Sequence, residues 1–415
     1  MSRLKEFRYF IYAATLLGQQ LYWGMYSLLG GEITSDTSGG AIYKAFLIGL
    51  FVLTFVFSLK DINFNRIKGN SKFVFFIILL YIFFYLFENF IGNGGKYEWT
   101  QKSFIFFGLY AVPGVLIGTA FYLNGYHGLY KHLDLISFVF GIGYLRSLPR
   151  MLFAGSIIEG YNNLAYYSAI SFGFILYGIL SKRKDRYAIF NFKITKIFSI
   201  IVALLLIVCV LSSGGRGGTM LLFVEIIILV TSFIKKKNII STIVISVPVI
   251  IMVVFLFSNL FSNSIFSDIL EKGTGRAFSY FGKGGIDMSQ TSNRDIKYRE
   301  AWKLIQENPL LGSGVFSTIG KYGYPHNIFL EIWESGGFFF LFIWLIIMMR
   351  CYFNYRKILK MYKSSKALLP LFLYPLVELL FSGSYVMEIT FFFAIATLLP
   401  KPLMYQLQYK EIPQS

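Results

Sequence analysis

The chain has 415 residues, of which 56% are hydrophobic and 14% charged, and its net charge is +18. An ordinary soluble domain carries about 25% charged residues, so this composition argues against a soluble enzyme, a disordered chain and a nucleic-acid-binding domain. A membrane-spanning helix needs about 20 mostly apolar residues. The two cysteines are too few for a disulfide framework or a Cys-rich metal site.

Long apolar runs separated by charged or Gly-rich breaks predict an all-α, polytopic membrane protein with about 12 transmembrane helices in one integral domain, 1–415. The first run lacks a small-residue cleavage site and is long enough to span, so we interpret it as a helix and not as a signal peptide. The predicted spans are 9–30, 41–59, 73–92, 104–124, 132–146, 162–180, 196–211, 218–234, 239–261, 328–349, 367–384 and 386–400.

The basic residues predict the orientation of these spans. One set of alternate breaks, which includes both termini, holds 25 Lys and Arg, whereas the other short breaks hold 5. Because cytoplasmic loops carry the excess of Lys and Arg, both termini are expected in the cytoplasm. Most of the positive charge then needs no explanation beyond orientation and contact with anionic headgroups.

The break at 262–327 is the longest and falls on the external side by alternation. Within it, 293–308 is expected to form an amphipathic helix, ended by Asn308-Pro309 and lying over the membrane surface. Its apolar stripe consists of Tyr298, Ala301 with Trp302, and Ile305.

A Gly-rich turn with one arginine, Ser212 to Thr219, separates two spans on the external side. The preceding run, 197–211, is only about 22 Å long as a helix, so the turn is expected below the membrane surface. Glycines let backbone N–H groups approach an anion, and Arg216 adds a bidentate fork that suits phosphate. The alternative is a tight turn with an arginine that reaches the interface.

Only three histidines occur, and His326 is the only one on the predicted external side. Its ordinary pKa suits proton transfer near neutral pH. Asn327, Glu331 and Glu334 follow on one stripe of the next helix, where a carboxylate normally faces a cavity or a partner. The alternative is a helix cap with interfacial polar residues.

Further candidates are less distinctive. Arg299 lies near Arg294 on the expected amphipathic helix, and Arg150 lies in the break before span 162–180. Five charged residues inside the spans have no role that we can assign: Lys44, Glu88, Glu225, Glu378 and Glu388. The sequence has no Asp-x-Asp, P-loop, HExxH or Gly-x-Ser-x-Gly motif. An outward site with arginines and one histidine suits an anionic, lipid-linked donor whose leaving group is a pyrophosphate.

Five segments resemble the C-terminal signature of the O-antigen polymerase and O-antigen ligase family: Arg294 to Ile296, Ala301 to Ile305, Glu307 to Gly314, Pro325 to Glu331 and Gly336-Gly337. The turn around Arg216 resembles the family's Ser/Arg-Gly motif, and Tyr161 to Ala165 is similar to a weaker Asn-x-x-Ala feature. Relatives often have Ser where this chain has Gly-Gly before Arg216.

The resemblance implies a fold of the lipid-linked-sugar (GT-C-like) glycosyltransferase type and a metal-independent transferase without cofactors. It implies a multi-pass protein of the bacterial cytoplasmic (inner) membrane with a periplasmic active site. The expected partners are undecaprenyl-pyrophosphate-linked oligosaccharides as donor and acceptor, membrane lipids, a chain-length regulator and a flippase, with no nucleic acid. Its essential arginines carry over onto Arg216 and Arg294, and its histidine onto His326.

We therefore predict a polysaccharide polymerase that transfers a growing glycan to the next lipid-linked repeat unit. The expected catalytic residues are Arg216, Arg294 and His326. The expected substrate-binding residues are Asn327, Glu331, Gly215, Gly217, Tyr324, Arg299, Arg150 and Asn163. One alternative is a ligase that transfers the glycan to lipid A–core, because both activities share these motifs. Another is a polysaccharide flippase or transporter, which twelve spans would also suit.

Overall fold

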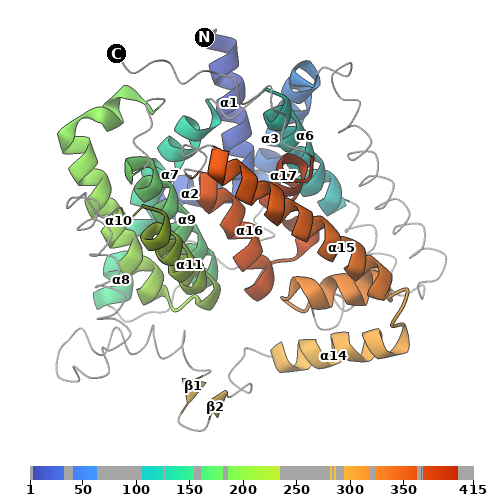
Figure 1. The fold of residues 1–415 in the computed structure, drawn as a ribbon. Helices are drawn as coiled ribbons and strands as arrows, with labels where there is room; N and C mark the ends of the chain where they lie inside the picture. The colour runs from blue at the N-terminus through green and yellow to red at the C-terminus, as the bar shows by residue number, and fades with distance from the viewer. Residues whose placement is uncertain are drawn as a thin grey trace. The chain divides into compact units, whose positions relative to one another are not determined.

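Helices dominate the part of the chain that the computed structural model describes, namely 3–31, 41–62, 105–124, 128–153, 160–180, 186–233, 281–282, 285–286, 294–317, 323–361, 366 and 368–400 (Figure 1). The one sheet in these residues is an antiparallel pair of two-residue strands, in which Phe281 pairs with Ile286. Four of the described helices are long and apolar enough to cross a membrane: Ala41–Asp61, Tyr161–Leu180, Lys193–Ser213 and Ile328–Leu359. The structure is that of a helical membrane protein.

The elements follow one another along the chain with short connections wherever both ends are described. They are α1 (Arg3–Leu16), α2 (Gly18–Leu28), α3 (Ala41–Asp61), η3 (Phe107–Ala111), α6 (Val112–Asn124), α7 (Leu129–Leu145), α8 (Leu148–Phe153), α9 (Tyr161–Leu180), η4 (Ala188–Asn191), α10 (Lys193–Ser213), α11 (Arg216–Phe233), β1 (Phe281–Gly282), β2 (Gly285–Ile286), α14 (Arg294–Glu307), α15 (Ile328–Met361), α16 (Leu369–Phe381), η8 (Tyr385–Met387) and α17 (Ile389–Leu398).

The chain forms two compact units. The first comprises 1–47, 128–291 and 366–381, and the second 48–127, 292–365 and 382–415. At the centre of the first unit, α9 packs against α7, α10, α11 and α16 (Figure 1). In its most apolar stretch 83% of the residues are buried, against 22% for α3. A helix that is apolar on all sides belongs in the interior of a bundle, which is where α9 lies.

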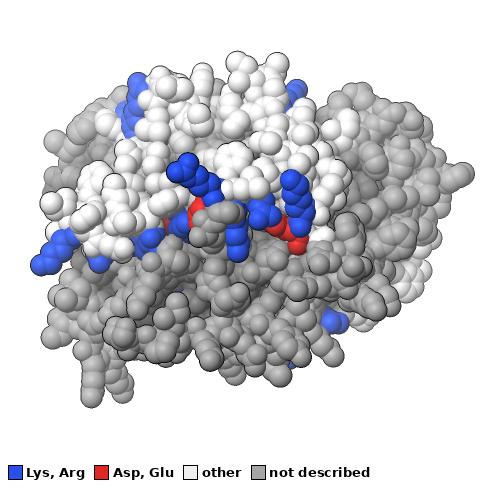
Figure 2. Space-filling model, turned by 90° about the horizontal axis from the view of Figure 1, so that it is seen from above, with Lys and Arg blue, Asp and Glu red and all other residues white. Residues whose placement is uncertain are grey.

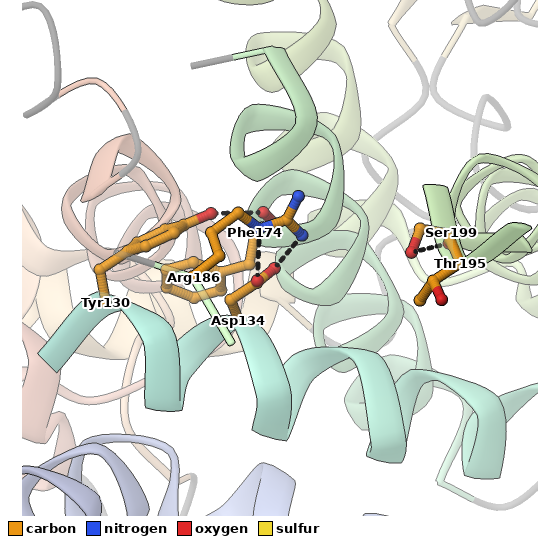
Figure 3. A network of polar contacts seen from close by, with 6 residues as sticks. All are labelled: Tyr130, Asp134, Phe174, Arg186, Thr195 and Ser199. Atoms are coloured by element: carbon orange, nitrogen blue, oxygen red, sulfur yellow. Dashed lines mark hydrogen bonds and ion pairs between the residues drawn. The ribbon is translucent and has the colours of Figure 1, made fainter. Parts of the chain in front are cut away.

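One end of the first unit is held by charged and polar contacts among the predicted cytoplasmic breaks. Lys131 pairs with Glu6, and the Tyr187 hydroxyl lies 2.8 Å from His132 Nδ1. The guanidinium of Arg186 makes two hydrogen bonds to the carboxylate of Asp134, at 2.8 and 3.0 Å (Figure 3). Seen from the side on which α1 begins in Figure 1, Lys and Arg side chains gather with a few acidic groups among them (Figure 2).

At the other end of the same unit, predicted external breaks contact one another. Arg146 Nη1 donates a hydrogen bond of 3.1 Å to the carbonyl of Ser27, and Gly215 packs against the backbone of Tyr161. Basic and glycine-rich breaks are thus segregated to opposite ends of this helix bundle. This is the arrangement that alternation of the breaks across a membrane requires.

The second unit is built around α15. This helix packs against α14 and α17, while α17 also packs closely against α6. The close approach depends on Gly114 and Gly118 of α6, because a side chain at either position would overlap α17. A second kink-forming glycine, Gly337, interrupts α15 with φ +71°. The second unit therefore contains the segment 294–337 that carries most of the sequence motifs.

Ten predicted spans overlap described helices, whereas 73–92 and 239–261 lie outside the described residues. Two predicted ends are wrong. The helix predicted over 196–211 is α10, Lys193–Ser213, and the helix predicted to end at 349 continues to Met361. Cys351 is consequently buried within α15, although a basic loop was expected there. Long basic side chains reach the interface, so a helix can extend beyond its apolar run.

Candidate functional site

The Gly-rich turn joins α10 to α11 in the first unit. Gly214 ends α10 in the left-handed conformation, with φ +74°, and Arg216 is the first residue of α11. Because α10 has 21 residues, it is about 30 Å long and matches the thickness of the hydrocarbon. The expectation that a short helix recesses this turn is therefore wrong.

The turn is nevertheless covered by protein, because its glycines pack against the beginning of α9. A side chain at Gly215 or Gly218 would overlap Ala165, and one at Gly217 would overlap the Tyr166 hydroxyl. Gly218 meets the backbone of α9, so no side-chain rotation could relieve that overlap. The Gly-Arg turn and the segment Tyr161 to Ala165, about 50 residues apart in the sequence, thus form one structural feature.

The geometry of the turn leaves Arg216 half-buried at the amino end of an 18-residue helix. Ser213 Oγ accepts a hydrogen bond from the Gly215 N–H, and Thr219 Oγ1 donates one to the Gly215 carbonyl, so the turn is fixed on both sides. The first N–H groups of a helix have no intrahelical acceptor, and its dipole is positive at this end. With the guanidinium of Arg216, this is chemically an anion-binding corner.

In the second unit, His326 is held in a defined tautomer and orientation. It is one of two non-glycine residues with positive φ among the described residues, at +54°, a conformation that persists only where the surroundings fix it. Its Nδ1 donates a hydrogen bond to the carbonyl of Ser382, since a carbonyl can only accept. The Tyr324 ring packs edge-on against the imidazole, with 4.5 Å between centroids. Nε2 is therefore the nitrogen that carries the lone pair in the neutral ring.

Two cations lie near that imidazole. Lys297 Nζ is 2.9 Å from His326 Nε2, and Arg294 lies one helical turn earlier on α14. Burial lowers the pKa of His326 to about 4, with further lowering by Lys297 and Arg294 against an opposing effect of the Ser382 carbonyl. Burial and the charge of Arg294 also lower the pKa of Lys297. At neutral pH the histidine is therefore an unprotonated base.

The two candidate arginines of α14 differ in their surroundings. Arg299 is exposed and pairs with Asp295, with 3.3 Å between Nη2 and Oδ2. Arg294 is half-buried and its charge acts on His326. The structure thus brings Arg294 and His326 together and directs Arg299 toward an acidic neighbour.

The polar residues that follow His326 serve the helix that they begin. The side-chain oxygen of Asn327 accepts hydrogen bonds from the N–H groups of Phe329 and Leu330, so Asn327 caps α15. The buried carboxylate of Glu331 accepts hydrogen bonds from the Ser384 hydroxyl and the Tyr385 N–H. Ser382 and Lys297 hold the histidine, whereas the sequence suggested Asn327 and Glu331 for that role.

The glycines of the remaining motif have a packing role. The Ser313 N–H donates to the Glu334 carbonyl at 2.7 Å, and the Phe338 N–H donates to the Pro309 carbonyl at 2.9 Å. A side chain at Gly337 would overlap the backbone of Leu310. The segment after α14 is thereby fixed to the kink of α15, and this contact sets the position of α14 beside His326.

The predicted site residues divide between the two units. Arg150, Asn163, Gly215, Arg216 and Gly217 belong to the first unit, and Arg294, Arg299, Tyr324, His326, Asn327 and Glu331 to the second. Within the first, the turn around Arg216 contacts the helix that carries Asn163, while Arg150 is exposed on α8.

Sequence reasoning missed Lys297. The external loop contains eight basic residues, and nothing in composition distinguishes this one. The spacing does contain a signal, because Lys297 precedes Ala301 and Ile305 by four and eight residues, and both are buried. A lysine on the buried stripe of an amphipathic helix needs a partner or a function. The expected stripe also included Trp302, which is 45% exposed although its ring contacts Trp333.

Comparison with known proteins agrees with the motifs. Residues 200–345 match a family model described as O-antigen ligase, and this range includes the Gly-Arg turn, α14 and His326. No curated protein matches the chain. Over residues 200–345 the chain thus carries the domain of the O-antigen polymerase and ligase family that its motifs indicate.

Proposed function

We propose that this protein is a polysaccharide polymerase of the bacterial inner membrane. In this proposal the chain crosses the membrane twelve times, both termini are cytoplasmic, and the loop 262–327 and the active site face the periplasm. The segregation of basic and glycine-rich breaks to opposite ends of the first unit supports this topology. The substrates are two glycans, each carried on undecaprenyl pyrophosphate.

The proposed reaction is a glycosyl transfer without a metal cofactor. The acceptor hydroxyl oxygen bonds to the anomeric carbon of the donor, and the bond from that carbon to the pyrophosphate oxygen breaks with its electron pair. His326 Nε2 takes the hydroxyl proton. Arg216 and Arg294 bind the pyrophosphate and stabilise the charge that develops on it, and Arg150 binds the second lipid phosphate. The products are a longer lipid-linked glycan and undecaprenyl pyrophosphate.

The observation that carries the proposal is the state of His326. Its Nδ1 proton is committed to Ser382, its Nε2 carries a lone pair, and its pKa of about 4 leaves it unprotonated at neutral pH. A neutral imidazole beside cations suits removal of a proton next to an anionic leaving group.

The second candidate is O-antigen ligase activity, which the description of the matching family model favours. The chemistry at the donor is the same, and only the acceptor differs: a lipid-linked repeat for the polymerase and lipid A–core for the ligase. The acceptor requirement therefore separates the two activities.

Single substitutions in cells test the site. His326→Ala removes the base and Arg216→Ala removes a phosphate-binding cation, so each is expected to abolish long-chain glycan on an electrophoretic ladder while the amount of protein in the membrane holds. His127→Ala is the matched control, because this histidine lies in a predicted cytoplasmic break. Normal polymer in both site variants would exclude this assignment.

A further inference from the structure

We propose that Lys297 caps the base nitrogen of His326 while the site is empty, and transfers its hydrogen bond to a phosphate oxygen when the donor's pyrophosphate binds. Donor binding would then expose the base to the acceptor hydroxyl. This role rests on the proposed glycosyl transfer and assigns to Lys297 a position in it.

The hydrogen bonds of the imidazole determine which group donates. Because Nδ1 donates to the Ser382 carbonyl, the neutral ring can only accept at Nε2. Lys297 Nζ lies 2.9 Å from Nε2 and is the donor of that bond. The one lone pair that could receive a proton is therefore occupied in this structure, and an acceptor hydroxyl can reach it only after the ammonium has moved.

The charges around Lys297 give that movement a cause. The groups facing the imidazole are Lys297 and Arg294 from α14, the Ser382 carbonyl, and the Tyr324 ring of its own loop. Among the described residues, the acidic side chains of α14 that form ion pairs do so with Arg299 and Lys303. Lys297 and Arg294 thus present two positive charges one turn apart. A hydrogen bond from an ammonium to a phosphate is stronger than one to a neutral imidazole, so an arriving pyrophosphate competes for Lys297.

Chemical modification of His326 in the purified full-length protein tests the cap without any glycosyl transfer. Diethyl pyrocarbonate acylates an imidazole nitrogen that has a free lone pair, and mass spectrometry locates the product on the peptide that contains His326. Inorganic pyrophosphate is expected to accelerate this modification severalfold over sodium chloride of equal ionic strength. Lys297→Ala is expected to react at the faster rate without pyrophosphate. Lys303→Ala, a control on the exposed side of the same helix, is expected to behave like the unmodified chain.

The acid limb of kcat/KM gives a second readout, because it reports the pKa of the base in the free enzyme. His326 loses activity when it is protonated, so activity falls as the pH drops through the pKa of His326. Removal of the Lys297 charge raises that pKa from about 4 toward the ordinary 6.5. Lys297→Ala is thus expected to move the limb to higher pH, whereas Lys297→Arg, which keeps the charge, restores it most of the way.

A modification rate at His326 that neither pyrophosphate nor Lys297→Ala changes would overturn the cap. So would an acid limb that stays in place in Lys297→Ala. If instead His326→Ala retains polymer synthesis while the modification rates behave as expected, the histidine is capped but is not the base, and the proposed function fails separately.

Discussion

Single residues in this protein are fixed by partners that lie far away in the sequence. Asp134 and Arg186 form a buried ion pair in which both side chains are at most 4% exposed, and Arg186 also lies 4.9 Å above the Phe190 ring (Figure 3). The pair joins α7 to the segment before α10. Removing one member of a buried pair leaves an uncompensated charge, whereas replacing both by apolar groups costs far less.

This asymmetry predicts the stability of variants at the pair. Asp134→Leu is expected to lower the free energy of unfolding by about 3–5 kcal/mol, and Arg186→Met added to it is expected to restore most of the loss. Thermal unfolding in detergent measures both. The exposed pair of Arg299 with Asp295 is the control, where Arg299→Ala is expected to cost about 0–1 kcal/mol. An equal loss at the two sites would show that burial does not decide the outcome.

At this scale the sequence predicted part of the site. His326 could be found because histidine is rare here and its side chain has one chemical use near neutral pH. Lys297 could not be separated from the other loop lysines, because its role depends on a contact across 29 residues. Asn327 and Glu331 lie on the predicted helix face, but their hydrogen bonds go to α15 itself and to Ser384.

At the scale of elements, glycines decide how closely the helices pack. Gly218 of α11 meets the backbone of α9 at Ala165, whereas Gly49 of α3 has open space around its Cα. Adding one methyl group therefore has opposite consequences at the two positions.

Gly218→Ala is expected to push α11 away from α9, lower stability by about 1–3 kcal/mol and reduce activity through Arg216, which begins the same helix. Gly49→Ala is the matched control, and it is expected to be neutral or to stabilise by about 0.5–1 kcal/mol, because alanine favours a helix more than glycine does. Melting temperature and polymer yield check both variants. The packing argument fails if the two variants behave alike.

Apolar runs predicted where helices lie but not where they end. The run at 196–211 reports the cost of burying polar groups in lipid, while the helix continues to Lys193 because backbone hydrogen bonds do not depend on side-chain polarity. The 34-residue length of α15 has the same origin. Its kink at Gly337, which fits against Leu310, could not be predicted, because it depends on a contact with another element.

At the scale of the whole molecule, the net charge of +18 has two separate meanings. Most Lys and Arg lie in breaks that we assign to the cytoplasmic face, where they orient the chain. A small remainder, chiefly Arg216, Arg294 and Lys297, belongs to the segments that the family model matches. The helical class and the family could be predicted from the sequence, since composition and motifs determine them, whereas the contacts of that remainder could not.

Purified protein in lipid vesicles, supplied with a single undecaprenyl-pyrophosphate-linked repeat unit and no lipid A–core, tests the central claim most directly. A polymerase uses this one substrate as both donor and acceptor, so a ladder of lipid-linked glycans that grows with time is expected. The ladder should be absent with His326→Ala and present with His127→Ala. Products that form only after lipid A–core is added would contradict the polymerase assignment and establish the ligase.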